Sequence, residues 1–314
     1  MTFFCLAWIG LAEMPVGLQL VFAGVLGLCV GSFLNVAIYR LPEESLSVHE
    51  PKRSFCPKCK TQLAWTENLP LLSWLLQRGR CRHCQAPISV RYPLVEALTG
   101  ALYVLVAWIT PFAQWPLLLV QLLIVSGLIV ATFVDFDRFE IPDEVSLGGL
   151  ALCAPLSFLV PALHRDTALA RSLAEGAAVG GSDALVGALA GAAVGGGVLL
   201  LIGWCGKLAF GRDAMGLGDV KLLAAGGGFI GPGGALVALV LASVLASLAG
   251  VGNMLRFAWL SAARGRARGC PRSFRWALRT GRVAGRYVPF GPYLGMGIGI
   301  VLLAWNHVRE LFIS

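Results

Sequence analysis

The sequence predicts an all-α polytopic membrane protein, with about eight transmembrane helices and a zinc-ribbon-like cytoplasmic loop between the first and second. Three observations predict this fold class. The chain has 314 residues, of which 57% are hydrophobic and 13% charged, whereas a soluble domain carries roughly 25% charged residues. Apolar windows of spanning length recur along the chain. Two pairs of cysteines lie within one polar segment.

The apolar windows define the expected helices in order. The sixth and seventh are separated only by the Gly-Pro-Gly-Gly run 231–234, which is a tight-turn signal. The fifth carries Gly187, Gly191 and Gly195 at four-residue spacing, a pattern that lets helix backbones approach closely in lipid; a merely flexible apolar stretch is the alternative. The apolar residues 1–10 lack a basic region and a cleavage site, so we expect no removable signal peptide. The predicted spans are 17–39, 93–110, 117–134, 146–161, 184–204, 220–230, 235–255 and 289–306.

The distribution of basic residues predicts the orientation of these helices. With the N-terminus outside, the loops that face the cytoplasm hold nearly all lysines and arginines, as the positive-inside rule requires. A basic stretch could also bind nucleic acid, but here it lies between apolar spans, so we expect no nucleic-acid partner. The cytoplasmic loops are 40–92, 135–145, 205–219 and 256–288.

Four of the nine cysteines form a candidate metal site. Cys56 and Cys59 form one C-x-x-C pair, and Cys81 and Cys84 form another after 21 intervening residues. This spacing is typical of a zinc ribbon, in which four thiolates close a tetrahedral structural site. Disulfides are the alternative, but the predicted loop faces a reducing compartment. We expect His83 to lie beside the site rather than to bind the metal.

Two aspartates at the edges of apolar runs are the strongest candidates for catalysis. Asp135 ends one run and Asp219 begins another, and an ionisable residue at the edge of a membrane segment indicates a functional site. Glycines 216 and 218 remove bulk beside Asp219, which would let a substrate backbone approach. Lys221 lies near enough to influence its charge. The weaker rivals are the polar-loop acids Asp137, Glu140, Asp143, Glu144 and Asp213.

A pair of carboxylates from two helices can activate water. Carboxylates about 3 Å apart share one proton; the ionised member takes a proton from water, and the protonated member hydrogen-bonds to the scissile carbonyl. Because the pair titrates as a unit, neither aspartate is assigned as the base. The four histidines lie away from both segments, and no HExxH motif occurs. An intramembrane aspartyl protease is therefore the leading hypothesis.

The ordered motifs of this chain resemble those of the bacterial prepilin peptidases, GxGD-type aspartyl proteases that process type IV prepilins and type II secretion pseudopilins. The resemblance covers most of the chain. The two C-x-x-C pairs belong to it, and the other matching stretches are Gly31-Ser-Phe-Leu-Asn-Val-Ala-Ile-Tyr-Arg-Leu-Pro42, Asn68-Leu-Pro-Leu-Leu-Ser-Trp74, Arg91-Tyr-Pro-Leu-Val-Glu96, Asp135-Phe-Asp-Arg-Phe-Glu-Ile-Pro-Asp143, Gly216-Leu-Gly-Asp-Val-Lys-Leu222 and Pro289-Phe-Gly-Pro-Tyr293.

The resemblance implies that Asp135 and Asp219 are the catalytic pair, in the bacterial inner membrane. It implies cleavage at the cytoplasmic face, after a short basic leader, and then N-methylation of the new N-terminus with S-adenosylmethionine. Glu96 and Arg91 are our candidates for the methyl-donor site. We expect three parts: 1–40 as N-terminal segment and first helix, 41–92 as tetracysteine domain, and 93–314 as peptidase domain.

Other readings remain open at this point. The chain could be a peptidase without methyltransferase activity. It could also be an ion-coupled transporter that uses Asp135 and Asp219, although coupling sites usually lie near the midplane of the membrane and both aspartates are expected at its cytoplasmic face. A non-catalytic scaffold that docks through the cysteine loop is the third alternative.

Overall fold

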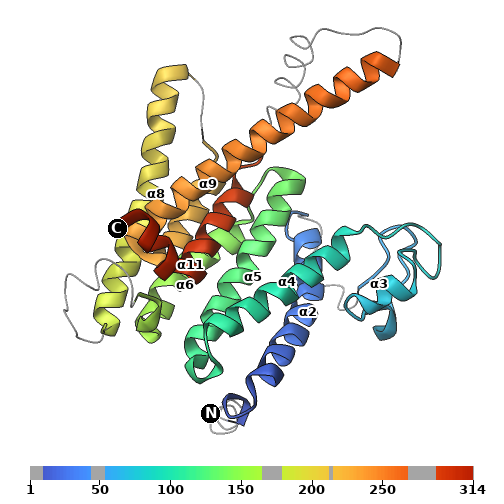
Figure 1. The fold of residues 1–314 in the computed structure, drawn as a ribbon, viewed down its shortest axis with the longest axis horizontal. Helices are drawn as coiled ribbons and strands as arrows, with labels where there is room; N and C mark the ends of the chain where they lie inside the picture. Colours follow the sequence, from blue (N-terminus) through green and yellow to red (C-terminus); the bar gives the residue numbers. More distant parts are fainter. Residues whose placement is uncertain (1–9, 44–53, 165–178, 212–214, 268–287, 314) are drawn as a thin grey trace.

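The computed structural model describes residues 10–43, 54–164, 179–211, 215–267 and 288–313, and shows a helical bundle with a small domain at one side (Figure 1). No β-strand occurs among these residues, which confirms the predicted all-α fold class. The helices are α2 (Val16–Arg40), η1 (Trp65–Asn68), α3 (Leu72–Leu76), α4 (Arg91–Ile109), η2 (Phe112–Gln114), α5 (Trp115–Arg138), α6 (Asp143–Leu159), η3 (Pro161–His164), α8 (Gly181–Phe210), α9 (Leu217–Ala267) and α11 (Gly291–Ile313).

Every predicted span coincides with one of these helices, and only the spans 93–110, 146–161 and 289–306 extend past a helix end, by one or two residues. Five helical stretches in the described residues are long and apolar enough to cross a membrane: Val16–Arg40, Arg91–Ile109, Phe112–Arg138, Gly181–Ala209 and Leu217–Ala263. The 17-residue α6 and the apolar stretch Gly291–Ala304 of α11 are shorter. The chain is thus a multi-pass membrane protein.

The sixth and seventh predicted spans both lie within α9, on either side of a break at Gly231. Gly231 has a φ of 76° and a ψ of 172°, outside the helical range. A Cβ on Gly227 would lie 3.1 Å from the Cβ of Ala235, although eight residues of straight helix span about 12 Å. The chain therefore doubles back at Gly231 and Pro232, and the predicted turn is confirmed.

Glycines let the main helix pairs pack with their backbones in contact. A Cβ on Gly195 of α8 would lie 2.5 Å from the carbonyl oxygen of Leu223 in α9, and one on Gly27 of α2 would lie 2.8 Å from the Cα of Gly100 in α4. Such approach lets van der Waals contact stabilise helix pairs in lipid, where apolar burial alone does not. The small-residue pattern predicted for α8 is confirmed as a packing surface.

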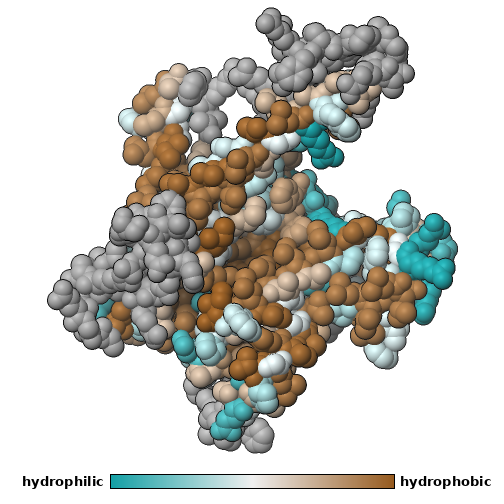
Figure 2. Space-filling model, viewed as in Figure 1, coloured by the Kyte–Doolittle hydropathy of each residue, from teal (hydrophilic) through white to brown (hydrophobic). Residues whose placement is uncertain are grey.

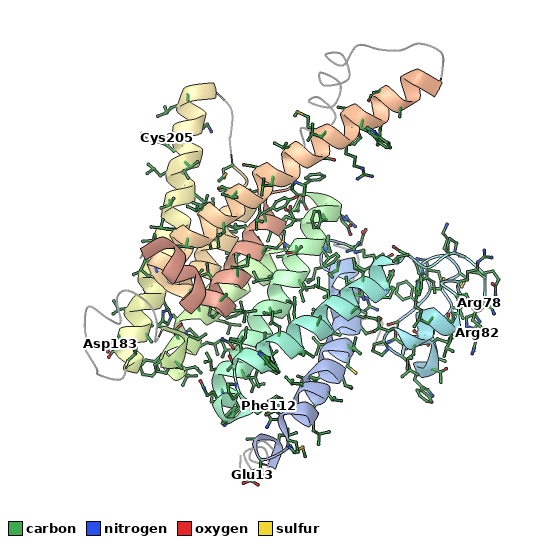
Figure 3. All side chains as sticks on the ribbon, viewed as in Figure 1. Glu13, Arg78, Arg82, Phe112, Asp183 and Cys205 are labelled. Carbon is green, nitrogen blue, oxygen red and sulfur yellow. The ribbon has the colours of Figure 1, made fainter. Side chains whose placement is uncertain are left out.

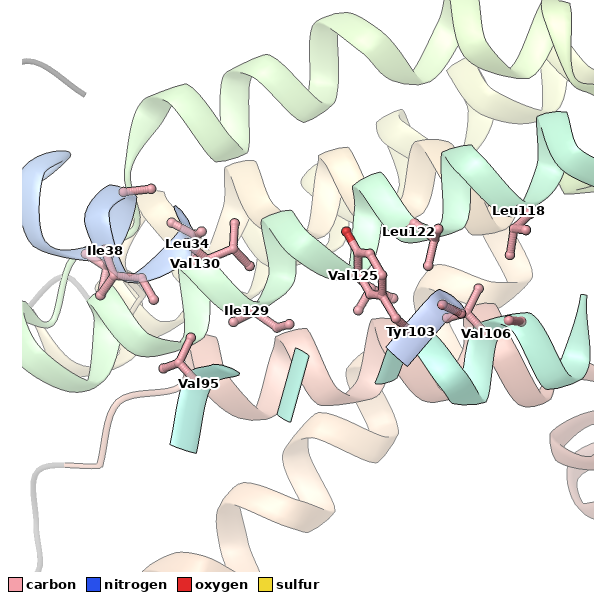
Figure 4. Packing of buried hydrophobic residues seen from close by; sticks show 14 of the residues in the cluster. Leu34, Ile38, Val95, Tyr103, Val106, Leu118, Leu122, Val125, Ile129 and Val130 are labelled. Atoms are coloured by element: carbon pink, nitrogen blue, oxygen red, sulfur yellow. The ribbon is translucent and has the colours of Figure 1, made fainter. Parts of the chain in front are cut away.

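The core nearest the small domain lies between α2, α4 and α5 (Figure 4). Leu34 and Ile38 of α2, Val95 of α4 and Val130 of α5 are buried there. Tyr103 adds a hydrogen bond between its hydroxyl and Ser126 Oγ at 2.9 Å. This packing fixes the ends of α2 and α4 that are predicted to face the cytoplasm. The small domain extends from these ends.

Three of the segments expected outside, 1–16, 111–116 and 162–183, lie on the side of the bundle away from the small domain. Figure 3 labels Glu13 and Phe112 at the bottom of the bundle and Asp183 at its left, one from each segment. The small domain instead extends from the other side, and its tip carries the labelled Arg78 and Arg82. This arrangement agrees with the predicted orientation, which stays a prediction.

Candidate active site

Asp135 lies in the last turn of α5 and is only 6% exposed. The helix ends at Phe139, whose left-handed φ of 57° is uncommon for a residue other than glycine. The Phe139 N–H donates to the Asp135 carbonyl oxygen at 3.0 Å. The Gly291 N–H, at the start of α11, donates to the Asp135 carboxylate. The carboxylate is therefore held at the meeting point of two helix ends.

Asp219 lies in the first turn of α9, and its carboxylate is close enough to interact electrostatically with that of Asp135. Gly218 brings the two segments together, because a Cβ there would lie 3.2 Å from the Cβ of Ile141. A Cβ on Gly216 would lie 3.4 Å from Asp219 Oδ2. The sequence suggested that both glycines make room for substrate, but Gly218 packs against the segment that follows Asp135.

Both aspartates line one open cavity of about 510 Å³. Its wall also includes Phe139 and Ile141 from the segment between α5 and α6, and Leu41 and Pro42, which directly follow α2. The cavity therefore opens at the end of the bundle from which the small domain extends. The ends of several helices meet at this cavity because the chain reverses its direction between successive apolar spans.

Salt bridges tie the segments around this cavity. Lys221 Nζ lies 2.7 Å from Asp143 Oδ1, so the ion pair of this lysine is with the start of α6 rather than with Asp219. Arg91 pairs with Asp137 in an exposed contact between α4 and α5. Arg138 Nη2 lies 2.9 Å from Glu43 Oε2. The rival candidates Asp137 and Asp143 thus have cationic partners, and Asp213 lies outside the described residues.

The four cysteines of the small domain converge on one point. All four Sγ atoms lie within 4.8 Å of one another, and those of Cys56 and Cys84 are 3.9 Å apart. A tetrahedral site with Zn–S bonds of ~2.3 Å places sulfurs ~3.8 Å apart. A disulfide would require ~2.05 Å. The Cys56–Cys84 distance matches a tetrahedral site, and the four thiols lie close enough together to hold one metal ion.

Two similar turns carry these thiols. The Lys60 N–H donates to the Cys56 carbonyl and the Gln85 N–H to the Cys81 carbonyl, at 2.8 and 2.9 Å. Lys60 and Gln85 each have a left-handed φ of 58°. This repeated geometry places the two cysteines of each pair on the same side of their turn. His83 is not part of the cysteine cluster, and its Nε2 atom lies 3.5 Å from Glu67 Oε1. This agrees with the expectation that His83 lies beside the metal site and does not bind the metal.

Without a metal ion, the four thiols would not all be ionised at neutral pH. Hydrogen bonds from the side chain and backbone of Thr61 lower the pKa of Cys59 to about 6. The Ala86 N–H acts to lower the pKa of Cys84, but desolvation and the neighbouring thiols raise it to about 11. Four thiolates therefore cannot coexist cheaply here unless a metal ion compensates their charge.

A second cavity of about 370 Å³ lies between the small domain and the adjacent ends of α2 and α4. Glu96, only 8% exposed, accepts hydrogen bonds from the Leu71 N–H at 2.8 Å and from the Ser32 side chain. Trp74 and Tyr92 also line this cavity, whereas Arg91 does not. Asn35, Trp74 and Gly291 lie in stretches that match the family motifs, but the sequence alone predicted no role for these three residues.

Comparisons with known proteins identify the family. Residues 25–110 match the Bacterial Peptidase A24 N-terminal domain, and residues 122–251 match the Type IV leader peptidase family. The chain belongs to the type IV leader peptidase family. Family membership agrees with the resemblance that the motifs predicted, and the first match contains the four cysteines and Glu96 while the second contains both aspartates.

Curated relatives of this family cover most of the chain. A prepilin leader peptidase/N-methyltransferase of Aeromonas hydrophila is 35% identical over 313 residues, which is 91% of each chain. One of Myxococcus xanthus is 43% identical over 231 residues, 74% of this chain and 62% of the relative. One of Neisseria gonorrhoeae is 36% identical over 251 residues, 73% of this chain and 80% of the relative. No solved structure matches the chain.

Proposed function

We propose that this chain is an intramembrane aspartyl peptidase that removes the basic leader of type IV prepilins or type II secretion pseudopilins, with Asp135 and Asp219 as its catalytic pair. The observation that carries the proposal is the convergence of these two carboxylates, from α5 and α9, on one open cavity. The names of the relatives support the substrate class.

The proposed reaction uses the two carboxylates as one unit. They share a single proton, because like charges at short range cannot both ionise cheaply. The ionised carboxylate takes a proton from water as the water attacks the scissile carbonyl. The protonated carboxylate donates a hydrogen bond to that carbonyl oxygen, and a proton then reaches the leaving amine. The Gly291 N–H orients Asp135 for this role.

The position of the pair favours a peptidase over the transporter alternative. Asp135 lies in the last turn of its helix and Asp219 in the first turn of its own, whereas coupling sites of transporters usually lie near the midplane. We assign this end of the bundle to the cytoplasmic face of the bacterial inner membrane, since the basic loops belong there. A prepilin would present its cleavage site at the same depth, where its basic leader meets its hydrophobic helix.

We propose a second activity, N-methylation of the new N-terminus with S-adenosylmethionine as methyl donor, which supplies an electrophilic methyl group. The cavity beside Glu96 has the volume of a small-molecule site, roughly 300–1,000 Å³. Its buried carboxylate suits a cationic ligand, and Trp74 and Tyr92 offer aromatic faces. Arg91, the other candidate, would act from outside this cavity through its contact with Asp137.

We propose zinc as the metal of the tetracysteine site, with Cys56, Cys59, Cys81 and Cys84 as its four ligands. Four thiolates leave no open coordination position, so the ion would hold the domain together rather than take part in chemistry. The proposed division of the chain follows from these roles: 1–40 as N-terminal segment and first helix, 41–92 as tetracysteine domain and 93–314 as peptidase domain.

Cleavage of a purified prepilin tests the peptidase assignment. The wild-type protein, Asp135→Asn and Asp219→Asn are compared with S-adenosylmethionine present, and the products are weighed by mass spectrometry. We expect both variants to lose leader removal, and the wild-type product to gain one methyl group. Asp137→Asn is the matched control: it lies on the same helix two residues away, is exposed and does not line the cavity, so cleavage should persist. Wild-type cleavage by either variant of the pair would exclude that residue from catalysis.

A binding measurement tests the methyl-donor site separately. Glu96→Gln removes the charge and keeps the shape of the side chain. We expect weaker binding of S-adenosylmethionine by isothermal titration calorimetry, with leader removal retained. Unchanged binding would refute the assignment of Glu96 without affecting that of the aspartate pair.

A further inference from the structure

A row of exposed apolar side chains runs along the outer side of the tetracysteine domain. Its members come from η1, from α3 and from the residues between them. We call this set the α3 stripe; its members and exposed fractions are Trp65 79%, Leu69 37%, Leu72 58%, Leu75 62% and Leu76 80%. Large apolar side chains gathered at such exposure indicate an interaction surface.

The other side of α3 is already committed to the domain. The Trp74 Nε1–H donates to the Ile88 carbonyl oxygen at 3.2 Å. A Cβ on Gly79 would lie 3.0 Å from the Trp74 ring, so the indole packs directly on that turn. Because Trp74 already fixes α3 on the domain, the leucines of the stripe are not needed to hold this helix in place.

The charge of the domain complements an anionic surface. Across 54–90 the only acid is Glu67, which is buried, whereas the exposed basic residues are Lys58, Lys60, Arg78, Arg80 and Arg82. Figure 3 labels Arg78 and Arg82 at the outer edge of the domain, and Figure 2 shows a teal tip beside the brown surface over α3. Arginine and lysine near a membrane surface attract anionic lipid headgroups.

The α3 stripe also adjoins the lipid-facing surface of the bundle. The domain leads directly into α4: Val90, just before this helix, and Leu94, in its first turn, are 65% and 55% exposed, and Phe33 of the neighbouring α2 is 54% exposed. Figure 1 shows the small domain, with α3 in it, next to the ends of α2 and α4 from which it extends. The apolar surface thus extends from the transmembrane helices to the domain.

We propose that the α3 stripe docks the tetracysteine domain onto the bilayer, in the leaflet that α4 enters. Trp65 and the leucines enter the boundary between headgroups and acyl chains, where tryptophan is favoured. The nearby arginines contact anionic headgroups. This docking is a property of the domain and does not depend on the proposed peptidase activity. It fixes the side wall of the cavity beside Glu96 against the bundle.

Fluorescence of the full, metal-loaded chain in nanodiscs tests the proposal. The discs contain one copy of the chain in phosphatidylcholine with phosphatidylglycerol, with or without bromine on the acyl chains. The chain has nine tryptophans, so the signal of Trp65 is the difference between the wild type and Trp65→Phe. We expect this difference to be quenched by brominated lipid and to resist aqueous acrylamide.

A second variant separates docking from misfolding. Leu72, Leu75 and Leu76 are replaced together by serine, and bound metal is measured to show that the domain remains folded. We expect Trp65 in this variant to lose quenching by brominated lipid and to gain quenching by acrylamide. If Trp65 of the wild type is quenched by acrylamide and not by brominated lipid, the stripe faces water and the proposal is overturned. Protection from both quenchers also overturns it, because protein then covers the stripe.

Discussion

Alanine at Gly291 should inactivate the proposed peptidase without unfolding it. The first residue of α11 lies so close to Asp135 that an added Cβ would be 2.6 Å from its Oδ2 atom and 3.1 Å from its Cγ atom. Ordinary van der Waals contact begins at 3.4 Å, so the carboxylate oxygen must retreat by about 0.8 Å. The Cδ1 atom of Ile141, 3.0 Å from the same position, restricts the alternative of moving α11.

The expected loss follows from this displacement. Misplacing a reacting group by ~1 Å costs on the order of 100-fold in rate, or about 2.7 kcal/mol of transition-state stabilisation. Alanine also favours helix over glycine by about 1 kcal/mol, so α11 itself should not be weakened. We therefore expect kcat for prepilin cleavage to fall about 100-fold, with KM little changed because the cavity wall outside the pair is intact.

The assay is cleavage of purified prepilin by the variant in detergent, with the thermal unfolding temperature measured on the same sample. Gly299→Ala is the matched control on the same helix, because its added Cβ meets nothing nearer than 3.9 Å. It should cleave at the wild-type rate. A Gly291→Ala variant with wild-type kcat would refute the reasoning, since Asp135 could then be displaced without cost.

Three further predictions concern contacts around the site. Lys221→Met removes an exposed ion pair with Asp143; exposed pairs contribute about 0–1 kcal/mol, so kcat/KM should fall less than about fivefold, and high salt should shrink the difference. Removal of metal by a chelator should increase amide hydrogen exchange across 54–90 and leave exchange in α5 unchanged, because the small domain has little core of its own; equal exchange with and without metal would contradict this. His164 is buried, and desolvation lowers its pKa to about 4. The unfolded chain binds a proton near pH 6.5, so stability should be lost as pH falls from 6.5 towards 4, and His164→Gln should abolish that part of the pH dependence of unfolding by denaturant.

The sequence predicted the helices well because lipid imposes a strong pattern. A span must be apolar over its whole length and satisfy its own backbone hydrogen bonds, so each window could be found without knowing its neighbours. The same patterns located the turn at Gly231 and the close-packing face of α8. They did not predict how closely the two halves of α9 approach each other, where a Cβ on Gly227 would lie 3.1 Å from the Cβ of Ala235, because this depends on tertiary packing.

The sequence predicted which residues form the site but not how these residues are arranged in space. Asp135 and Asp219 stand out because charge is costly at the edge of an apolar run, and the cysteines stand out by spacing. The contact of Gly291 with Asp135 and the pairing of Lys221 with Asp143 join segments that are far apart in the chain. Local patterns carry no information on such pairings. Lys221 was therefore assigned to its sequence neighbour Asp219, although its partner lies on α6.

The end of α2 lies between the two cavities and limits how the two proposed activities can be connected. Tyr39 and Arg40 line the cavity beside Glu96, while Leu41 and Pro42 line the cavity of the aspartate pair. Arg40 is only 3% exposed and its guanidinium lies 5.8 Å from the centre of the Phe55 ring, so this segment is packed against the tetracysteine domain. Under the proposed function, the new N-terminus released at the aspartate pair must pass this segment to reach the methyl donor. Cleavage and methylation would then be sequential events at two sites, and a variant that loses the second should accumulate cleaved, unmethylated product.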